Sequence, residues 1–525
     1  MAEKKIGTLI KVVPIKRQIA DRGDSKSGNP VFYDSLLLYY RDKDGKKQKI
    51  FEPRAEIPYS IIIDKECPEA ISQPMFIEAD KVKTTLVWSD ELYNELGIAT
   101  GTSAFVDKYL MARKISEAKN VLLHPWVYDA DMDIGDRYIQ KFTEEYEPDI
   151  GYNLHKAFFD IECDLDGYIG FPDEDLAPCP ACLITLFDQK TMTFHCHILK
   201  NPKNKNQAKV LADLPGFEKY VKDWIKTNDG LDVNFQFYVY DNELEEIAEF
   251  FKNVHRIDPD FCCAWNAGYD CKSLQNRLKK LVNRDKNFQA IFNSEHKKIA
   301  DIKNGEYTAD EIANYLICDE RDRMQTDSAG FPLELFFIPY FKQEKEKNIV
   351  DRTEAYMILD GTVWQDQMGL YASIRKTSGQ KESYSLDAIA GEELGKEKLP
   401  FAPGETIKNL PWINFKKFLH YNIVDVLRLY QLESKNLDLD MIQRLSEITN
   451  TRKEKVFKKT ISLKNFVSKF ARDSGFVMAD NRNARYGEDG VSQMFKNNFI
   501  KHKTEIQEND PVYKEAFGKK ENYGA

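Results

Sequence analysis

The chain has 525 residues, more than one ordinary hydrophobic core holds, so we expect two or three domains. Hydrophobic residues make up 42% of it and no apolar run approaches a membrane span or a signal peptide, so we expect a cytosolic protein. The net charge of −10 excludes a surface that is basic throughout, but it leaves room for a local basic groove and hence for nucleic acid.

The first region of the chain mixes short strand patterns with polar turns. Apolar runs at 7–15, 34–42 and 59–64 predict strands, while 89–98 and 106–119 have the spacing of helices. This pattern predicts a separate α+β domain over residues 1–151.

The run FFDIEC then places two carboxylates directly after a hydrophobic stretch. In a strand, Asp160 and Glu162 point to one face, and Phe159, Ile161 and Cys163 point to the other. A strand that ends in two acids can hold a divalent cation at its tip. A lone D-x-E is weak support, however, and a strand end in solvent is the more ordinary explanation.

Cysteine and histidine residues between 179 and 197 raise the question of zinc. The nine cysteines are an odd number in a long chain, which argues against a disulfide framework. Cys179, Cys182, His195 and His197 could be drawn as a zinc site. Two strands at 183–188 and 193–199, with both histidines on one face, explain the segment better, because zinc-finger histidines are usually spaced more widely. We expect no zinc.

A helix, a short strand and another helix are predicted next, at 242–257, 259–266 and 268–282. This alternation is typical of an α/β domain. In WNAGYD, Asn266 lies at the junction of strand and helix, and Asp270 lies in the first turn of the helix. Taken alone, Asp270 is an acid that the helix dipole stabilises.

A polar region from 283 to about 350 has little periodicity and predicts an insertion or a mobile hairpin. A clear helix follows at 419–437. In its segment YNIVD, Tyr421 and Asp425 are four residues apart and therefore share one helix face. Taken alone, such a pair is a common side-chain contact.

The segment from Arg452 to Arg472 is helical, basic and partly apolar. It contains eight Lys or Arg residues and one acid, which fits either a solvated helix face or contacts with phosphates. An apolar stripe runs along it, formed by Leu463, Phe466, Val467 and Phe470.

Asp160, Glu162, Asp270 and Asp425 could together serve one reaction. Hydrolysis of a phosphodiester needs a nucleophilic water and relief of charge on the leaving oxygen, and two divalent ions about 3.5–4 Å apart provide both. A strand D-x-E, a helix-start Asp and a helical Y-x-x-x-D supply carboxylates for two ions and a hydroxyl to orient the water. Hard oxygen ligands favour Mg²⁺ or Mn²⁺ over zinc.

The order FDIE, WNAGYD and YNIVD resembles the three exonuclease motifs of family B DNA polymerases, above all those of large tailed bacteriophages. The segments at 364–374, 384–401 and 444–471 are also similar to this family, and the likeness extends over about 152–479. The resemblance implies an α/β and α+β fold. A ribonuclease-H-like 3′–5′ exonuclease domain with a mixed sheet would follow an N-terminal α+β domain and precede helices leading into a palm.

The resemblance also implies roles for individual residues. Asp160 would bridge two metal ions, Glu162 and Asp425 would complete the nucleophile-side ion, and Asp270 would hold the leaving-group ion. Tyr421 would orient the attacking water. The DNA contacts would come from Phe171 stacking on the terminal base, from Asn266 positioning the strand, and from the basic residues Lys458 and Lys459.

The family's polymerase motifs are absent from the sequence: there is no D-x-x-S-L-Y-P-S, K-x-x-x-N-S-x-Y-G or Y-x-D-T-D-S. We therefore expect a split polymerase or a fragment of one. The expected parts are an N-terminal domain at 1–151, an exonuclease at 152–437 with an insertion at about 283–355, a helical connector at 438–479 and an incomplete palm at 480–525. The palm segment should be disordered or pair with a partner.

The expected partners are DNA, with a single-stranded 3′ end or a primer-template, and a second chain carrying palm, fingers and thumb. A sliding clamp is a further candidate, and no membrane is expected. For a viral protein, the site of action would be the host cytoplasm. Two alternatives remain: a catalytically silent scaffold or DNA-binding subunit that completes the polymerase, and a stand-alone DNA repair nuclease.

Overall fold

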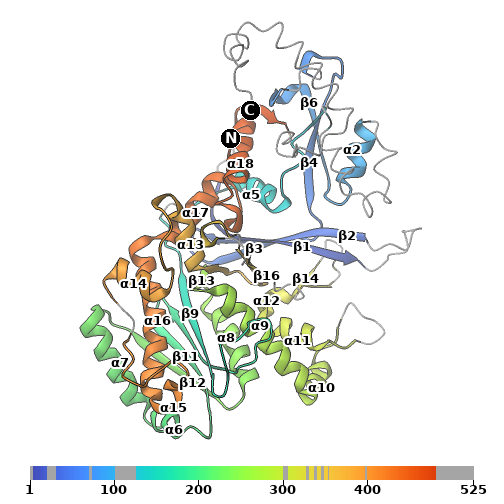
Figure 1. The fold of residues 1–525 in the computed structure, drawn as a ribbon. Coiled ribbons are helices and arrows are strands. Elements are labelled where there is room, and N and C mark those ends of the chain that lie inside the picture. Colours follow the sequence, from blue (N-terminus) through green and yellow to red (C-terminus); the bar gives the residue numbers. More distant parts are fainter. Residues whose placement is uncertain are drawn as a thin grey trace, which may run out of the picture.

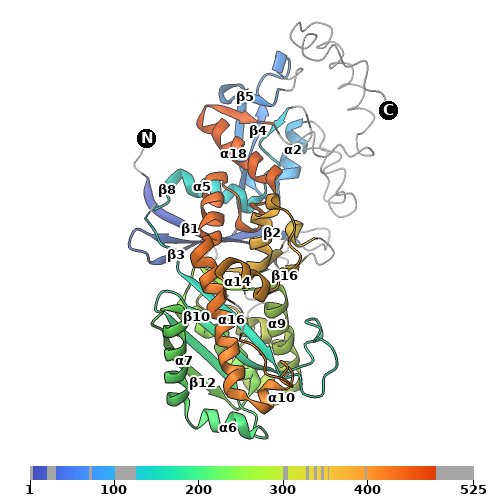
Figure 2. The same cartoon turned by 60° about the vertical axis from the view of Figure 1, so that its left-hand side comes forward.

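A computed structural model provides the structure of the chain (Figure 1 and Figure 2). In both views β4 (Glu56–Ile62) and α18 (Lys459–Asp473) lie towards one end of an elongated molecule, and α6 (Lys205–Leu211) and α7 (Leu214–Asp229) lie towards the other. Strand β1 (Lys5–Ile19) crosses the middle. No helix in the part of the chain that the structure describes is both long and apolar enough to cross a membrane. The described residues are 4–19, 31–69, 74–100, 124, 126–149, 151–298, 305–326, 330, 332–335, 340–343, 348–352, 354–396 and 399–479.

The first sheet has the strand order β3-β2-β1-β8 and apolar residues on both faces. Val12 and Leu38 pack against helix α5 (Ile134–Glu145), whereas Val13 and Leu37 belong to the same core as Phe159 of the large sheet. The predicted strands at 7–15 and 34–42 are thus confirmed, and this sheet is buried from two sides. Its strands are β1 (Lys5–Ile19), β2 (Val31–Asp42), β3 (Lys47–Glu52) and β8 (Tyr146–Glu147).

Two smaller sheets complete the N-terminal region, with orders β6-β4-β7 and β19-β5. Strand β19 comes from far along the chain and pairs antiparallel with β5, so the segment after α18 returns to the N-terminal strands. The predicted helix at 89–98 is α2, whereas the one predicted at 106–119 lies outside the described residues. The elements are β4 (Glu56–Ile62), β5 (Phe76–Glu78), η1 (Ala79–Lys81), β6 (Val82–Trp88), α2 (Leu92–Thr100), β7 (Val127–Tyr128) and β19 (Phe476–Met478).

A mixed six-stranded sheet with the order β12-β11-β10-β9-β13-β18 forms the centre of the second region. β9, β10 and β11 are antiparallel neighbours, while β13 pairs in parallel with both β9 and β18. The carboxyl ends of β9, β13 and β18 therefore meet at one edge. The strands are β9 (Lys156–Cys163), β10 (Ala181–Asp188), β11 (Thr193–Leu199), β12 (Asn234–Tyr240), β13 (Phe261–Ala264) and β18 (Val363–Asp366).

Helices cover both faces of this sheet (Figure 1). α8 and α9 share a core with the β9 residues Ala157, Phe159 and Ile161, while α7, α13, α14 and α16 share a core with Phe158 on the opposite face. The mixed sheet between helix layers confirms the predicted ribonuclease-H-like α/β class. The helices are α6 (Lys205–Leu211), α7 (Leu214–Asp229), α8 (Glu243–Ile257), α9 (Ala267–Arg284), α13 (Gln367–Ile374), η4 (Lys376–Ser378), α14 (Leu386–Leu394), α15 (Leu410–Ile413) and α16 (Phe415–Asn436).

The polar region after α9 contains regular structure that its weak periodicity did not predict. Thr308 and Glu311 form a capping box at the start of α11, and Ile312 and Ile317 of that helix pack into the core shared with α8 and α9. The sequence analysis predicted an insertion or a mobile hairpin here and did not predict these helices. The elements are α10 (Lys286–Glu295), α11 (Ala309–Ile317), α12 (Glu320–Arg323), β14 (Met324–Thr326), β15 (Pro332–Glu334), β16 (Tyr340–Gln343), η3 (Ile349–Asp351) and β17 (Glu354–Met357).

The helices after α16 lead back to the N-terminal strands. In α18 the inward positions carry small or polar residues, and the predicted apolar stripe lies on the outward side, where Leu463 and Phe470 are 64% and 65% exposed. The segment 480–525, for which we predicted an incomplete palm, lies outside the described residues. The elements are α17 (Asp438–Thr449), η5 (Lys453–Lys455) and α18 (Lys459–Asp473).

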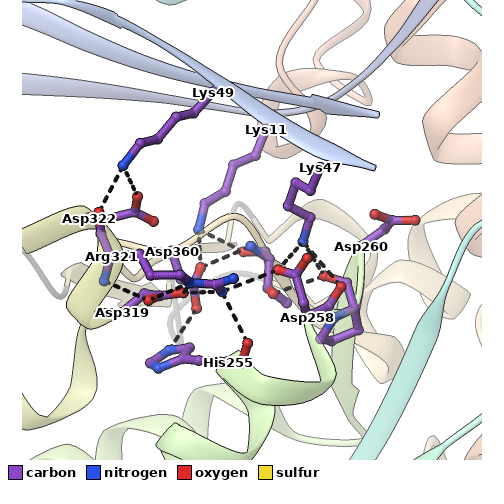
Figure 3. A network of polar contacts seen from close by, with 12 residues as sticks. Lys11, Lys47, Lys49, His255, Asp258, Asp260, Asp319, Arg321, Asp322 and Asp360 are labelled. Atoms are coloured by element: carbon purple, nitrogen blue, oxygen red, sulfur yellow. Dashed lines mark hydrogen bonds and ion pairs between the residues drawn. The ribbon is translucent and has the colours of Figure 1, made fainter. Parts of the chain in front are cut away.

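Ion pairs join the first sheet to the segments that precede β13 and β18 (Figure 3). Lys11 Nζ donates to Asp360 Oδ1 at 2.8 Å, and the two side chains are only 5% and 1% exposed. Burial alone would raise the pKa of Asp360, but the charge of Lys11 and the contact with His255 hold this pKa well below its ordinary value. Lys47 adds a 2.9 Å pair with Asp258. Charges buried in this way stabilise the junction only while both partners are present.

Candidate active site

Two acids project from the carboxyl end of β9. Phe159 and Ile161 enter one core and Phe158 enters the other, so the side chains of the strand alternate as predicted. By the same alternation, Asp160 and Glu162 lie on the Phe158 face, which α16 covers. Both acids are partly exposed at the edge of the sheet.

Helix α16 brings the third acid to this edge. Asn414 caps the helix by accepting a hydrogen bond from the backbone N–H of Lys417. Tyr421 and Asp425 lie one turn apart on the helix, and both are buried. Carboxylate oxygens of Asp160, Glu162 and Asp425 all lie within 4.8 Å of one another.

Asp270 lies in the first turn of α9, after the N-cap residue Asn266, as predicted. Burial raises its pKa well above the ordinary value, and the charges of Asp160, Asp366 and Glu162 raise it further. Asp270 is therefore near the three clustered acids without belonging to the group that lies within 4.8 Å.

Asp366 is a neighbouring acid that the sequence analysis missed. It is the last residue of β18, is fully buried, and lies opposite Ala264 of β13 in the sheet register. Its side chain also caps α13 by accepting a hydrogen bond from the N–H of Gly369. The sequence did contain a pattern that could have identified Asp366, because VWQD ends a short strand in an acid much as FFDIE does.

Asn422 is the second residue that sequence reasoning did not single out, although it lies inside the YNIVD motif. Its side chain is fully buried, and its Nδ2 donates to Asp160 Oδ2 at 2.8 Å. A direct contact thus links α16 to the β9 carboxylate.

Two pairs of aromatic rings include residues of the candidate site or their neighbours in the chain. Phe171 is 74% exposed, and its ring centroid lies 4.8 Å from that of Tyr269, the residue before Asp270. The Phe401 ring stacks on Tyr421 with centroids 5.5 Å apart.

The loop that carries Phe171 is tied to α9. Arg277 binds both carboxylate oxygens of Glu243, at 2.7 and 2.6 Å, and also donates to the carbonyls of Ala177 and Pro178. Asn276 donates to the carbonyl of Glu174. These contacts hold the base of the loop next to the helix that bears Asp270.

Most of the basic run at the C-terminal end is engaged in ion pairs. Lys455 lies 2.7 Å from Asp133, Lys464 pairs with Asp131, and Lys469 lies 3.1 Å from Asp473. Lys458 and Lys459 are exposed at the start of α18. In both views α18 lies beside α5, to which Gln140 Nε2 links it through the carbonyl of Asn465, and β19 after it pairs with β5 (Figure 1 and Figure 2).

The histidines at 195 and 197 have partners within the sheet. They lie on one face of β11, as the alternation of the strand predicted, and contact Tyr238 and Tyr240 of β12. His197 Nδ1 lies 3.0 Å from Tyr240 Oη and its Nε2 lies 3.2 Å from Asn253 Nδ2. Burial lowers the pKa of His197 to about 3, so the ring is neutral at ordinary pH.

The acidic cluster fits divalent cations. Three carboxylates within 4.8 Å offer hard oxygen donors and repel one another, and Asp270 adds a fourth acid nearby.

Fold and site together define a ribonuclease-H-like domain with a carboxylate cluster at the carboxyl ends of its strands. Residues 129–329 match the family described as "DNA polymerase family B, exonuclease domain". The match supports an exonuclease domain of this family over those residues.

A curated relative is similar to part of this chain. The DNA-directed DNA polymerase of Escherichia phage RB69 is 24% identical over 308 residues, which cover 57% of this chain. The same match covers 28% of the phage protein, well under two thirds of its length.

Proposed function

We propose that this chain is the proofreading portion of a viral family B DNA polymerase and hydrolyses the 3′-terminal phosphodiester of DNA. The observation that carries the proposal is the gathering of Asp160, Glu162 and Asp425 within 4.8 Å, with Asp270 nearby. These acids come from three separate segments of the chain, so local sequence does not account for their meeting.

Each site residue has a proposed role. Bound Mg²⁺ or Mn²⁺ ions would supply the charge that activates the attacking water and stabilises the leaving oxygen. Asp160 would serve both ions, Glu162 and Asp425 the ion on the side of the water, and Asp270 the other. Tyr421, one helical turn from Asp425, would orient the water through its hydroxyl.

We propose that two side chains near Asp270 hold the DNA end. Phe171 would stack on the terminal base, because its side chain is 74% exposed. Its ring lies beside that of Tyr269, so the stacked base would lie near Asp270. Asn266, at the start of α9, would help to position the strand.

A nuclease assay tests the proposal. The purified chain with Mg²⁺ should shorten a 5′-labelled single-stranded oligonucleotide stepwise from its 3′ end. Asp160→Ala combined with Glu162→Ala should abolish the shortening. The matched control is Asp232→Ala with Asp241→Ala, two acids whose side chains are 82% exposed in surface ion pairs. Equal rates for both double variants would refute the assignment, and an inactive parent would favour a silent scaffold.

We further propose a second polypeptide that carries palm, fingers and thumb. The support is the outward face of α18, where Leu463, Phe466 and Phe470 are 64%, 42% and 65% exposed. Large apolar side chains gathered on one exposed helix face are typical of an interface. Lys458 and Lys459, at the start of this helix, would contact DNA phosphates.

Co-purification with a palm-bearing polypeptide tests this interface. Leu463→Ser combined with Phe470→Ser should abolish co-purification and leave the shortening of single-stranded DNA unchanged. The control is Leu86→Ser with Ile291→Ser, which removes side chains that are 55% and 49% exposed elsewhere. Retained co-purification of the α18 variant would refute the proposed interface.

A further inference from the structure

Asn422 is a buried amide at the centre of the candidate site. Its side chain is 0% exposed, and its Nδ2 lies 2.8 Å from Asp160 Oδ2. An ionised carboxylate only accepts hydrogen bonds, so the NH₂ end of the amide must face Asp160. Burying an amide in a helix–sheet interface costs free energy unless it is hydrogen-bonded. An apolar residue would suit this interface better if packing were the only requirement.

A second polar contact joins α16 to β9, away from the first along both elements. At the other end, Lys156 Nζ donates to Glu433 Oε1 at 2.7 Å, and both side chains are buried. From Asn422 to Glu433 the helix rises about 16 Å, and from Lys156 to Asp160 the strand extends about 13 Å. The two spans are similar, so the contacts fix the position of the helix along the strand.

This register decides where the α16 groups lie. Tyr421 and Asp425 flank Asn422 on the same helix, while Asp160 and Glu162 belong to the strand. A shift of the helix along the strand would separate Asp425 from the other two acids and break both contacts. The amide also carries no charge, so it orients the Asp160 carboxylate and leaves its negative charge for a cation. A lysine or arginine at this position would neutralise it.

We propose, on the basis of the proposed function, that Asn422 is a positioning residue. It fixes the orientation of the Asp160 carboxylate and the register of α16, and so holds Asp160, Glu162 and Asp425 in a geometry that binds a divalent cation. Such outer contacts to metal ligands commonly change metal affinity by about 10-fold to 100-fold.

Binding of Mn²⁺ alone, measured by calorimetry and by electron paramagnetic resonance on the full chain, tests this role without relying on activity. Asn422→Leu removes the donor at similar volume and should weaken Mn²⁺ binding at least about 10-fold. Asn422→Ala should do the same without added bulk and serves if the leucine variant fails to fold. Asn422→Gln keeps an amide donor and should recover part of the affinity.

Asn253→Leu is the matched control. Asn253 is also a buried amide in a helix, 3% exposed, and donates to one buried partner, His197. The Asn253→Leu variant should lose about as much stability as Asn422→Leu and should bind Mn²⁺ like the parent. Parent-like Mn²⁺ binding by Asn422→Leu or Asn422→Ala would overturn the role of Asn422 alone. A parent chain that binds no Mn²⁺ would instead overturn the proposed function.

Discussion

Lys11 allows a quantitative test of how the first sheet is joined to the domain built on the six-stranded sheet. Its Nζ donates to Asp360 and to the carbonyls of Ile358 and Thr362, and Asp360 also accepts from Trp364 Nε1 at 2.8 Å. Lys11→Met keeps the aliphatic length and leaves the Asp360 carboxylate buried without its cation. Breaking a buried pair in this way costs about 3–5 kcal/mol, so the free energy of unfolding should fall by about that amount.

Equilibrium urea denaturation, followed by circular dichroism, measures the effect. Lys11→Met with Asp360→Asn should regain part of the loss, because the amide removes the buried charge and still accepts from Trp364. The control Lys200→Met removes a surface pair with Asp241, whose side chains are 48% and 82% exposed, and should cost less than about 1 kcal/mol. Equal midpoints for Lys11→Met and Lys200→Met would refute the reasoning.

Three further predictions concern pH, the DNA end and the loop at 164–180. The pKa of Asp360 is lower in the folded chain than its unfolded value of about 3.9. Its contribution to stability is therefore complete above about pH 4 and is lost as the pH falls further. Asp360→Asn should flatten this acid dependence, as measured by urea titrations at several pH values. Phe171→Ala should raise the KM for single-stranded DNA about 5-fold to 100-fold with an unchanged melting temperature, since the ring is exposed. Arg277→Met should free the loop from α9, giving faster protease cleavage within residues 164–180 and slower DNA shortening.

Local patterns in the sequence predicted the parts of the site that depend on one element at a time. The period of two in β9 places Asp160 and Glu162 on one face, and the spacing of four in α16 places Tyr421 beside Asp425. Both patterns follow from backbone geometry alone. Asp270 could be placed in the first turn of a helix for the same reason.

Contacts between distant segments could not be predicted in this way. Asn422 reaches Asp160 only because α16 crosses β9, and nothing within YNIVD gives that crossing. The basic run at the C-terminal end has the pattern of a solvated or phosphate-binding helix. In the structure, acids that precede α5 or lie near its start, such as Asp131 and Asp133, neutralise part of it. The α11 helix was missed because polar residues mask its period, although its capping box was readable.

Crystals of the chain grown with Mn²⁺ and a short single-stranded oligonucleotide provide the most direct test of the central claim, because anomalous scattering locates the ion without any assumption about activity. The proposed site predicts a Mn²⁺ peak among the carboxylates of Asp160, Glu162 and Asp425, with the 3′ end of the DNA beside it. Bound DNA with no Mn²⁺ among these three acids, or a 3′ end bound far from them, would contradict the claim.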